Sequence, residues 1–104
     1  MKKNVIVDTK AQKEFHEFPR IIQKEFRSLI DDLEEEGKLD YPDAKKLQKN
    51  LFEMRVRQEG IYRGFYAYIQ KETIIIVRFF QKKTQKTPLK EIEIALRRLK
   101  QYAY

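Results

Sequence analysis

The sequence predicts a small α+β fold, in which an antiparallel sheet carries two N-terminal helices and a C-terminal helix in the order β-α-α-β-β-β-α. Two observations predict this class. Apolar residues recur at helical spacing in the first third of the chain and again near its end. Residues 51–80 instead alternate or run apolar with β-branched side chains, which is typical of strands. With 104 residues, the chain is expected to form a single domain over residues 1–104.

The first half of the chain predicts one strand and two helices. Residues 4–7 are a short apolar run that suits a strand. Thr9 begins a T-x-x-Q pattern that can act as a capping box for a first short helix. Pro19 suits the first turn of a second, amphipathic helix, which stops at Gly37. Residues 38–50 hold a proline and scattered apolar side chains, which predicts an ordered connection with a few apolar anchors.

The second half predicts three strands and a helix. Residues 51–57 alternate, so that one face of the strand is apolar and the other is ionic. Residues 61–69 alternate again after a turn, which predicts a hairpin. Residues 73–80 are β-branched and apolar apart from Arg78, as expected for a central strand covered on both faces. A Thr-Pro pair at 87–88 then suits the start of the last helix.

The charge of the chain favours an anionic partner. The net charge is +7 and the pI is near 9.6, which favours nucleic acid ahead of a membrane surface because no strongly amphipathic terminal helix is evident. The first ten residues, MKKNVIVDTK, contain only a short apolar run, far short of a signal peptide or a membrane span. We therefore expect a cytoplasmic protein without a membrane partner.

No metal or other cofactor is expected. The chain has no cysteine, which excludes disulfides and thiolate chemistry. The single histidine, His16, lies among acids far from the basic motifs, so we expect it at the surface. The acids in residues 31–36 are typical of a solvated helix end and lack the spacing of metal ligands. The glycines form no phosphate-binding loop.

A strongly basic loop follows the apolar run of residues 73–80. Residues 79–88 read FFQKKTQKTP and contain three lysines and no acid. Loops of this kind are usually just solvated. Lysines and hydroxyl groups in one loop also suit contacts with phosphate, so the loop is a candidate for binding nucleic acid.

Three motifs, taken in order, resemble one toxin family. The strand over residues 51–57 contains Glu-x-Arg, the next strand contains Tyr-Arg, and residues 80–88 supply Phe-x-Lys-Lys-Thr-x-Lys-Thr-Pro before a helix. This pattern resembles the RelE/ParE superfamily of type II toxins, and most closely its HigB-like, phage-derived branch. The resemblance covers most of the chain and is densest between residues 51 and 96.

The resemblance implies a RelE-like fold and a metal-independent endoribonuclease that cuts mRNA, usually on the ribosome. Attack by the RNA 2′-OH needs a proton acceptor, a proton donor to the leaving oxygen, and cations over the developing charge. Arg63 is expected to grip phosphate oxygens with Arg55 beside it, and Glu53 to accept a proton. The expected catalytic residues are Arg63, Glu53, Arg55 and Lys83. The expected RNA-binding residues are Arg57, Arg78, Lys82, Lys83 and Lys86.

These candidates also have plainer interpretations. Glu53 with Arg55 or Arg63 could be a surface ion pair that contributes at most ~1 kcal/mol. The tyrosines of residues 61–69 could stack on bases, but packing beneath a helix is favoured. Several relatives place a tyrosine or histidine close behind the basic loop as acid or base. Residues 84–94 contain neither, so the general acid and base stay open.

Two other classes of function also stay open: a ParE-like poison of a topoisomerase, and a non-catalytic, basic module that binds nucleic acid. For the nuclease, the resemblance implies mRNA and the ribosome as partners, together with a cognate HigA-like antitoxin that carries a helix-turn-helix domain. Complementary charge predicts an acidic contact surface on that antitoxin. The helix over residues 20–36 is the alternative docking surface.

Overall fold

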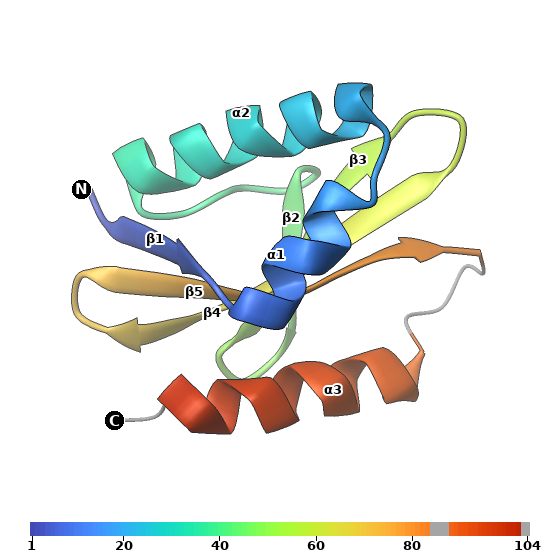
Figure 1. The fold of residues 1–104 in the computed structure, drawn as a ribbon. Helices are drawn as coiled ribbons and strands as arrows, with labels where there is room; N and C mark the ends of the chain where they lie inside the picture. Colours follow the sequence, from blue (N-terminus) through green and yellow to red (C-terminus); the bar gives the residue numbers. More distant parts are fainter. Residues whose placement is uncertain (84–87, 103–104) are drawn as a thin grey trace.

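Five strands form one sheet in the computed structural model, which describes residues 1–83 and 88–102 (Figure 1). The strands are β1 (Asn4–Val7), β2 (Ala44–Gln48), β3 (Leu51–Arg57), β4 (Ile61–Gln70) and β5 (Thr73–Lys82). The helices are α1 (Thr9–His16), α2 (Arg20–Glu36) and α3 (Leu89–Leu99), and a 3-10 turn, Lys100–Tyr102, follows α3. The predicted α+β class is confirmed. Thr87, the predicted cap of the last helix, lies outside the described residues.

The sheet is antiparallel except at one edge. Its strand order is β1-β5-β4-β3-β2, and every neighbouring pair from β2 to β5 runs antiparallel. β1 instead pairs in parallel with β5, in the register Asn4 to Thr73. The predicted antiparallel sheet therefore needs a correction at this edge, because alternation within a strand does not reveal which strand will lie beside it.

The predicted connection over residues 38–50 contains the strand β2, so this part of the prediction is wrong. Lys45 of β2 lies opposite Glu53 of β3. The turn between them depends on Asn50, whose φ is 54° and whose side-chain amide binds both backbone groups of Tyr68, at 2.7 Å and 2.9 Å. β2 lies at the edge of the sheet and exposes lysines, so its sequence lacks the apolar alternation that predicts a strand.

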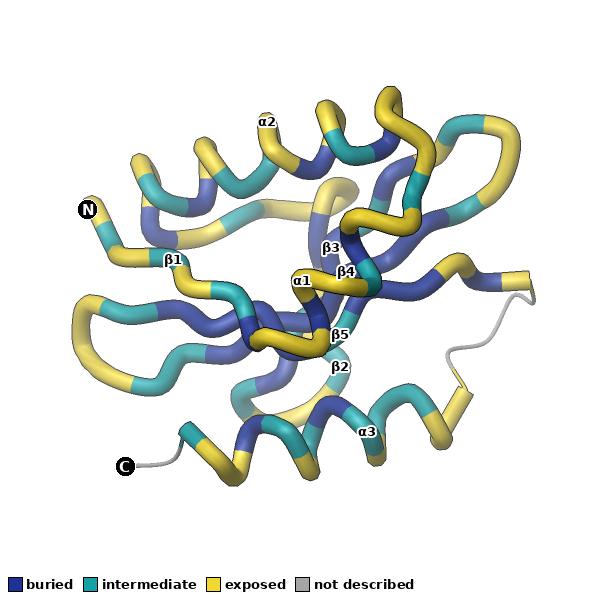
Figure 2. The backbone as a smooth tube through the Cα atoms, in the orientation of Figure 1, coloured by how far each residue is buried: buried dark blue, intermediate teal, exposed yellow. Residues whose placement is uncertain are grey.

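Apolar side chains pack on both faces of the sheet, and Figure 2 shows β4 and β5 buried over most of their length. Helices α1 and α2 cover one face, over a core that includes Phe15, Phe26, Met54, Tyr66, Ile76 and Phe79. Helix α3 covers the other face, over Leu51, Phe65, Ala67, Ile75, Val77 and Phe80. Residues 73–80 lie in β5 and are covered on both faces, as predicted, although β4 is the middle strand of the sheet and β1 pairs with only the first four residues of β5. The tyrosines of β4 pack on the α2 side, which confirms their predicted packing role.

The ends of the helices agree only in part with the predicted caps. α1 is capped by Asp8, whose carboxylate accepts hydrogen bonds from the backbone nitrogens of Lys10 and Ala11, both at 3.0 Å. The predicted capping box at Thr9 is wrong, because the charged Asp8 binds the free N–H groups more strongly. α2 ends as predicted at Gly37, whose φ of 77° favours glycine. No helix within the described residues is long and apolar enough to cross a membrane.

A network of ion pairs joins α1, β5 and α3. The carboxylate of Glu14 contacts the guanidinium of Arg78 and accepts hydrogen bonds from both terminal nitrogens of Arg98, at 3.0 Å and 2.8 Å. Arg98 also donates to the carbonyl of Val77 at 2.9 Å, and Nε of Arg78 donates to Glu91 at 2.6 Å. These side chains are largely buried, so the network holds the two helices against the last strand.

Replacing Glu14 with glutamine should lower the free energy of unfolding by about 2 kcal/mol, because two largely buried guanidinium groups then lose their carboxylate. Urea denaturation measures the change. Glu17→Gln is the matched control, since Glu17 is exposed and forms no ion pair within the described residues. Equal stabilities of the two variants would contradict the role of the network.

Candidate functional site

Five ionic side chains gather on the face of the sheet that also carries α3. Glu53 and Arg55 come from β3, Arg63 from β4, Lys82 from the end of β5 and Lys45 from β2. Strand alternation and cross-strand register place them on this face with the core residues beneath α3. We call these five residues the cation cluster, because four of them are basic.

A buried ion pair between Glu53 and Arg63 forms the centre of the cluster. The exposed fraction of the side chain is 0% for Glu53 and 3% for Arg63, and the two groups are in direct contact. Nε of Arg55 lies 3.8 Å from the same carboxylate oxygen, and Arg55 and Arg63 are register partners, as the predicted hairpin requires. Burial lowers the pKa of Arg63. The interpretation of Glu53 and Arg63 as a surface ion pair is therefore wrong.

Lys82 is buried beside this pair, at the point where β5 ends. Its exposed fraction is 5%. Burial, together with the positive charges of Arg63, Lys45 and Arg55, lowers the pKa of Lys82 to about 8. A lysine with a pKa this close to neutrality holds an appreciable fraction of neutral amine under physiological conditions, whereas an ordinary surface lysine is almost wholly charged.

Lys45 is the member of the cluster that the sequence analysis missed. Its side chain is exposed, and it lies directly across from Glu53. Its charge acts on Lys82, so it belongs to the same electrostatic site. The missed signal is the Lys-Asn pair at residues 49–50, which suits a tight turn between two strands and would have predicted a strand before it.

The remaining predicted residues lie at the margins of the cluster or apart from it. Arg57 is exposed at the end of β3, and Lys83 is exposed directly after β5. Lys86 lies outside the described residues. Arg78 is separate from the cluster and is engaged in the network with Glu14 and Glu91. Burial alone would lower the pKa of Arg78, but its hydrogen bonds and charge contacts with these two acids outweigh burial and raise it.

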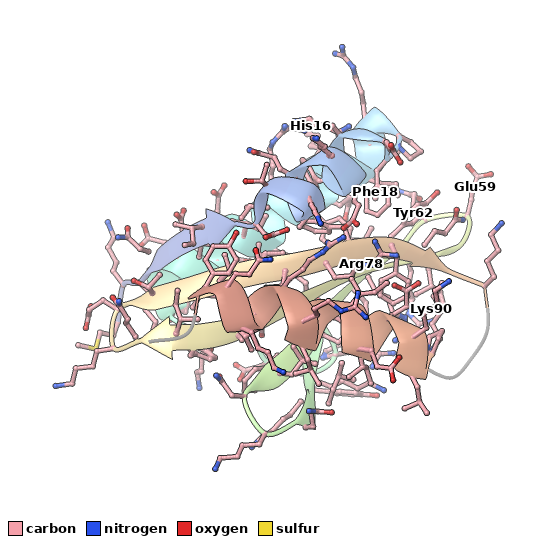
Figure 3. The ribbon with its side chains drawn as sticks, turned by 60° about the horizontal axis from the view of Figure 1, so that its bottom comes forward. His16, Phe18, Glu59, Tyr62, Arg78 and Lys90 are labelled. Atoms are coloured by element: carbon pink, nitrogen blue, oxygen red, sulfur yellow. The ribbon has the colours of Figure 1, made fainter. Side chains whose placement is uncertain are left out.

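His16 lies far from the cation cluster, on the other side of the sheet. It is exposed at the end of α1, where its Nδ1 lies 2.8 Å from the carbonyl oxygen of Gln12. Figure 3 shows His16 on one side of the sheet and Lys90 of α3 on the other. The prediction of a surface histidine is confirmed. Within residues 1–83 and 88–102, no group of three or more His, Asp or Glu side chains could hold a metal ion.

Comparisons with known proteins agree with this geometry. A model of the family described as phage derived protein Gp49-like (DUF891) matches residues 13–100. No curated protein matches the sequence significantly. A mutant of the E. coli toxin RelE in the free state shares 13% identity with a TM-score of 0.74, over 95% of this chain and 99% of that chain.

A second solved structure is the RelBE2 toxin-antitoxin complex from Mycobacterium tuberculosis. It shares 23% identity with a TM-score of 0.59, over 79% of this chain and 100% of that chain. At these identities the two structures show a common fold. The family model covers well over half of the sequence, and so this chain belongs to the phage-derived Gp49-like family and has the fold of RelE, as its three motifs predict.

Proposed function

We propose that this chain is the toxin of a type II toxin-antitoxin system, and that it is a metal-independent, ribosome-dependent endoribonuclease acting on mRNA in the cytoplasm. One observation carries the proposal. A buried Glu53–Arg63 pair holds basic side chains around Lys82, whose pKa is lowered to about 8. A lysine that can give up a proton beside fixed cations suits phosphate cleavage, whereas a module that only binds nucleic acid needs no buried lysine. The Gp49-like family and the RelE fold support the same function.

The two arginines of the hairpin suit the binding of the reacting phosphate. During cleavage the 2′-OH gives its proton to solvent, the 2′-oxygen bonds to phosphorus, the bond to the 5′-oxygen breaks, and negative charge grows on the phosphate oxygens. Arg55 and Arg63 face each other across neighbouring strands, so two planar guanidinium groups can stabilise that charge together. Exposed Lys83 lies close by in the chain and adds a further cation at the end of β5.

We assign Glu53 to positioning Arg63 instead of accepting a proton from the 2′-OH. Its carboxylate is fully buried and contacts the Arg63 guanidinium. Proton uptake by Glu53 would leave the charge of Arg63 unpaired in the interior, which is costly. An ionised Glu53 instead fixes the direction of the guanidinium, and preorganised cations stabilise a transition state more effectively than mobile ones.

Lys82 suits the transfer of a proton to the leaving 5′-oxygen. With a pKa of about 8 it is largely protonated at pH 7, and it gives up its proton more readily than an ordinary lysine. The surrounding positive charges that lower this pKa also favour the neutral amine after transfer. Exposed Arg57 and Lys45 would extend the basic surface along the bound RNA strand. Lys86 is proposed to bind RNA too, because the basic motif contains it.

A cognate HigA-like antitoxin with a helix-turn-helix domain is part of the proposal. The solved RelBE2 structure is a complex of a toxin with its antitoxin. The similarity of this chain to that structure supports an antitoxin partner here. A partner that covers the cation cluster would need acidic side chains, since buried lysines and arginines without counter-charges destabilise an interface.

Incubation with translating ribosomes, followed by mapping of mRNA ends, tests the function. The unmodified chain should produce discrete cuts. The double variant Glu53→Gln with Arg63→Gln should cut at least 100-fold more slowly, because it loses the guanidinium that binds the phosphate, and it removes the two charges of the buried pair together. Circular dichroism checks that the variant is folded. The control Glu59→Gln changes an exposed residue in the β3–β4 turn and should cut normally.

Other outcomes of that experiment would identify other functions. DNA breaks in the presence of a topoisomerase, without mRNA cuts, would indicate a ParE-like poison. Binding to RNA without breaks of either kind would indicate a non-catalytic module. Full toxicity of the folded double variant would remove the cation cluster from the mechanism.

The lowered pKa of Lys82 predicts a pH dependence of RNA binding. Lys82 loses its positive charge as the pH rises through about 8, so affinity for a 2′-O-methylated, uncleavable RNA should fall between pH 7 and pH 9. Fluorescence anisotropy measures this affinity. The Lys82→Arg variant should bind almost equally across the range, because arginine stays protonated there. Identical pH profiles for the two proteins would show that Lys82 does not titrate near 8.

The proposed antitoxin predicts the behaviour of the chain in cells. Expression of the unmodified chain alone should arrest growth, and expression with the neighbouring antitoxin gene should restore both growth and a high protein level. Growth curves and protein yields measure this outcome. Normal growth with abundant unmodified protein and no partner would contradict the toxin function.

A further inference from the structure

A small hollow lies at the edge of β3, next to the cation cluster. In Figure 1, the chain turns back after α2 and runs along the helix toward β2. The hollow lies between α2, the end of this connection and the last residues of β3, and its volume is about 280 Å³. Three residues of α2, residues 42–43 and residues 55–57 of β3 line it, and we call it the β3 edge pocket.

Arg55 joins the β3 edge pocket to the cation cluster. This residue lines the pocket, and its Nε lies 3.8 Å from the carboxylate of Glu53 within the cluster. Arg57 also lines the pocket and follows Arg55 by two residues, or about 7 Å of strand. One nucleotide of an extended single strand covers a similar length. An RNA strand whose reacting phosphate lies on the arginines of the hairpin therefore brings a neighbouring nucleotide to this pocket.

The apolar walls of the pocket are held by the core of the protein. Val56 belongs to the core beneath α1 and α2, and Leu29 packs against that core. The backbone carbonyl of Asp43 accepts a hydrogen bond from the backbone N–H of Arg55 at 3.0 Å, which fastens the end of the connection to β3. Pro42, whose ring restricts its backbone, adds a further apolar wall. The pocket is therefore a preformed hollow with fixed apolar sides.

The pocket also holds acids and cations that do not neutralise each other. Glu25 and Asp43 line it and are exposed. Within the described residues neither carboxylate forms a salt bridge, although two arginines line the same pocket. Arg57 has no acid partner in this part of the chain either. The two carboxylates are therefore available to hydrogen-bond donors of a ligand, and Arg57 is available to an anionic group.

We propose that the β3 edge pocket binds the base of a guanine nucleotide next to the phosphate that is cleaved, and so gives the chain a preference for guanine. A nucleotide matches this layout, because its base has two apolar faces and a polar edge and its phosphate is anionic. A peptide fits less well, since an acidic peptide is repelled by Glu25 and Asp43 and a basic peptide by the two arginines. The inference rests on the proposed function, because it names one base within the same RNA substrate.

The carboxylates select guanine among the four bases of RNA. An ionised carboxylate has two acceptor oxygens and no donor. Guanine alone presents two adjacent donors on its Watson–Crick edge, N1–H and the 2-amino group, so that one carboxylate can accept hydrogen bonds from both. Adenine and cytosine offer a single amino group there, next to a ring nitrogen that repels the second oxygen. Uracil presents its only donor between two carbonyl oxygens, which a carboxylate repels as well.

Binding of short, uncleavable RNA tests the inference. Four 2′-O-methylated hexanucleotides contain uracil throughout, except for one central position that is guanine, adenine, cytosine or uracil. Fluorescence anisotropy should show that the unmodified chain binds the guanine oligonucleotide at least about fivefold more tightly than the uracil one.

The pocket variant combines Glu25→Gln with Asp43→Asn, and it should lose most of this preference, because an amide has only one acceptor oxygen. The matched control combines Asp32→Asn with Glu36→Gln, which removes equal charge from exposed positions of α2 outside the pocket and should keep the preference. All four side chains are exposed, so both variants should fold.

Several outcomes would overturn the inference. Equal affinity of the unmodified chain for the guanine and uracil oligonucleotides would do so, and so would a guanine preference that survives in the pocket variant. The same loss in the control variant would attribute the preference to net charge. Binding of poly-lysine that is lost in the pocket variant, without any preference among the bases, would indicate a basic peptide as the occupant.

The failure of this inference can be distinguished from the failure of the proposed function. A guanine preference that depends on the pocket acids supports the inference even if the unmodified chain cuts no mRNA on ribosomes, in which case the proposed function alone fails. Cuts on ribosomes by a chain that binds the four oligonucleotides equally would contradict the inference alone.

Discussion

The buried contact between Glu53 and Arg63 is the constraint on which the candidate site depends. Two charges without solvent contact in the middle of a sheet are tolerated only while each compensates the other, so neither can be lost alone without a large cost in stability. The pair lies across two adjacent strands, so it also fixes how β3 and β4 are aligned. Arg55 and Lys45 take their places in the cluster from the same register.

The cluster destabilises the fold that carries it. The pKa of Lys82 is lower in the folded chain than in the unfolded chain, so the unfolded state binds more protons between pH 8 and about 10.5 and stability rises with pH across that window. Below pH 8 the folded protein must bury a charged amine, at a cost on the order of 3 kcal/mol. Sites that oppose stability in this way are typical of function, because packing alone would place an apolar residue at Lys82.

Much of the fold could be predicted from the sequence, because its apolar residues follow the periods of helices and strands. The alternation in residues 51–57 and 61–69 also predicts that Arg55 and Arg63 meet on one face. The edge strand β2 could not be found in this way, because an exposed edge needs no apolar face. Lys45 lies on β2 and was therefore not predicted as a site residue either. The burial of Lys82 depends on tertiary packing, which no local sequence pattern reveals.

Three arginines show that the position of a charged residue in the sequence does not reveal which partners it will have in the fold. Arg63 is paired with a buried acid on the face of the candidate site. Arg78 is bound between two acids of different helices. Arg27 is stacked on an aromatic ring and has no acid contact among the described residues. Their positions in the sequence do not distinguish these states. The three arginines differ in the number of carboxylates that other parts of the chain bring into contact with them. That number is determined only when α1 and α3 pack on opposite faces of β5. Basic side chains that are not paired with a carboxylate in this way stay available to binding partners. They lie on both sides of the sheet.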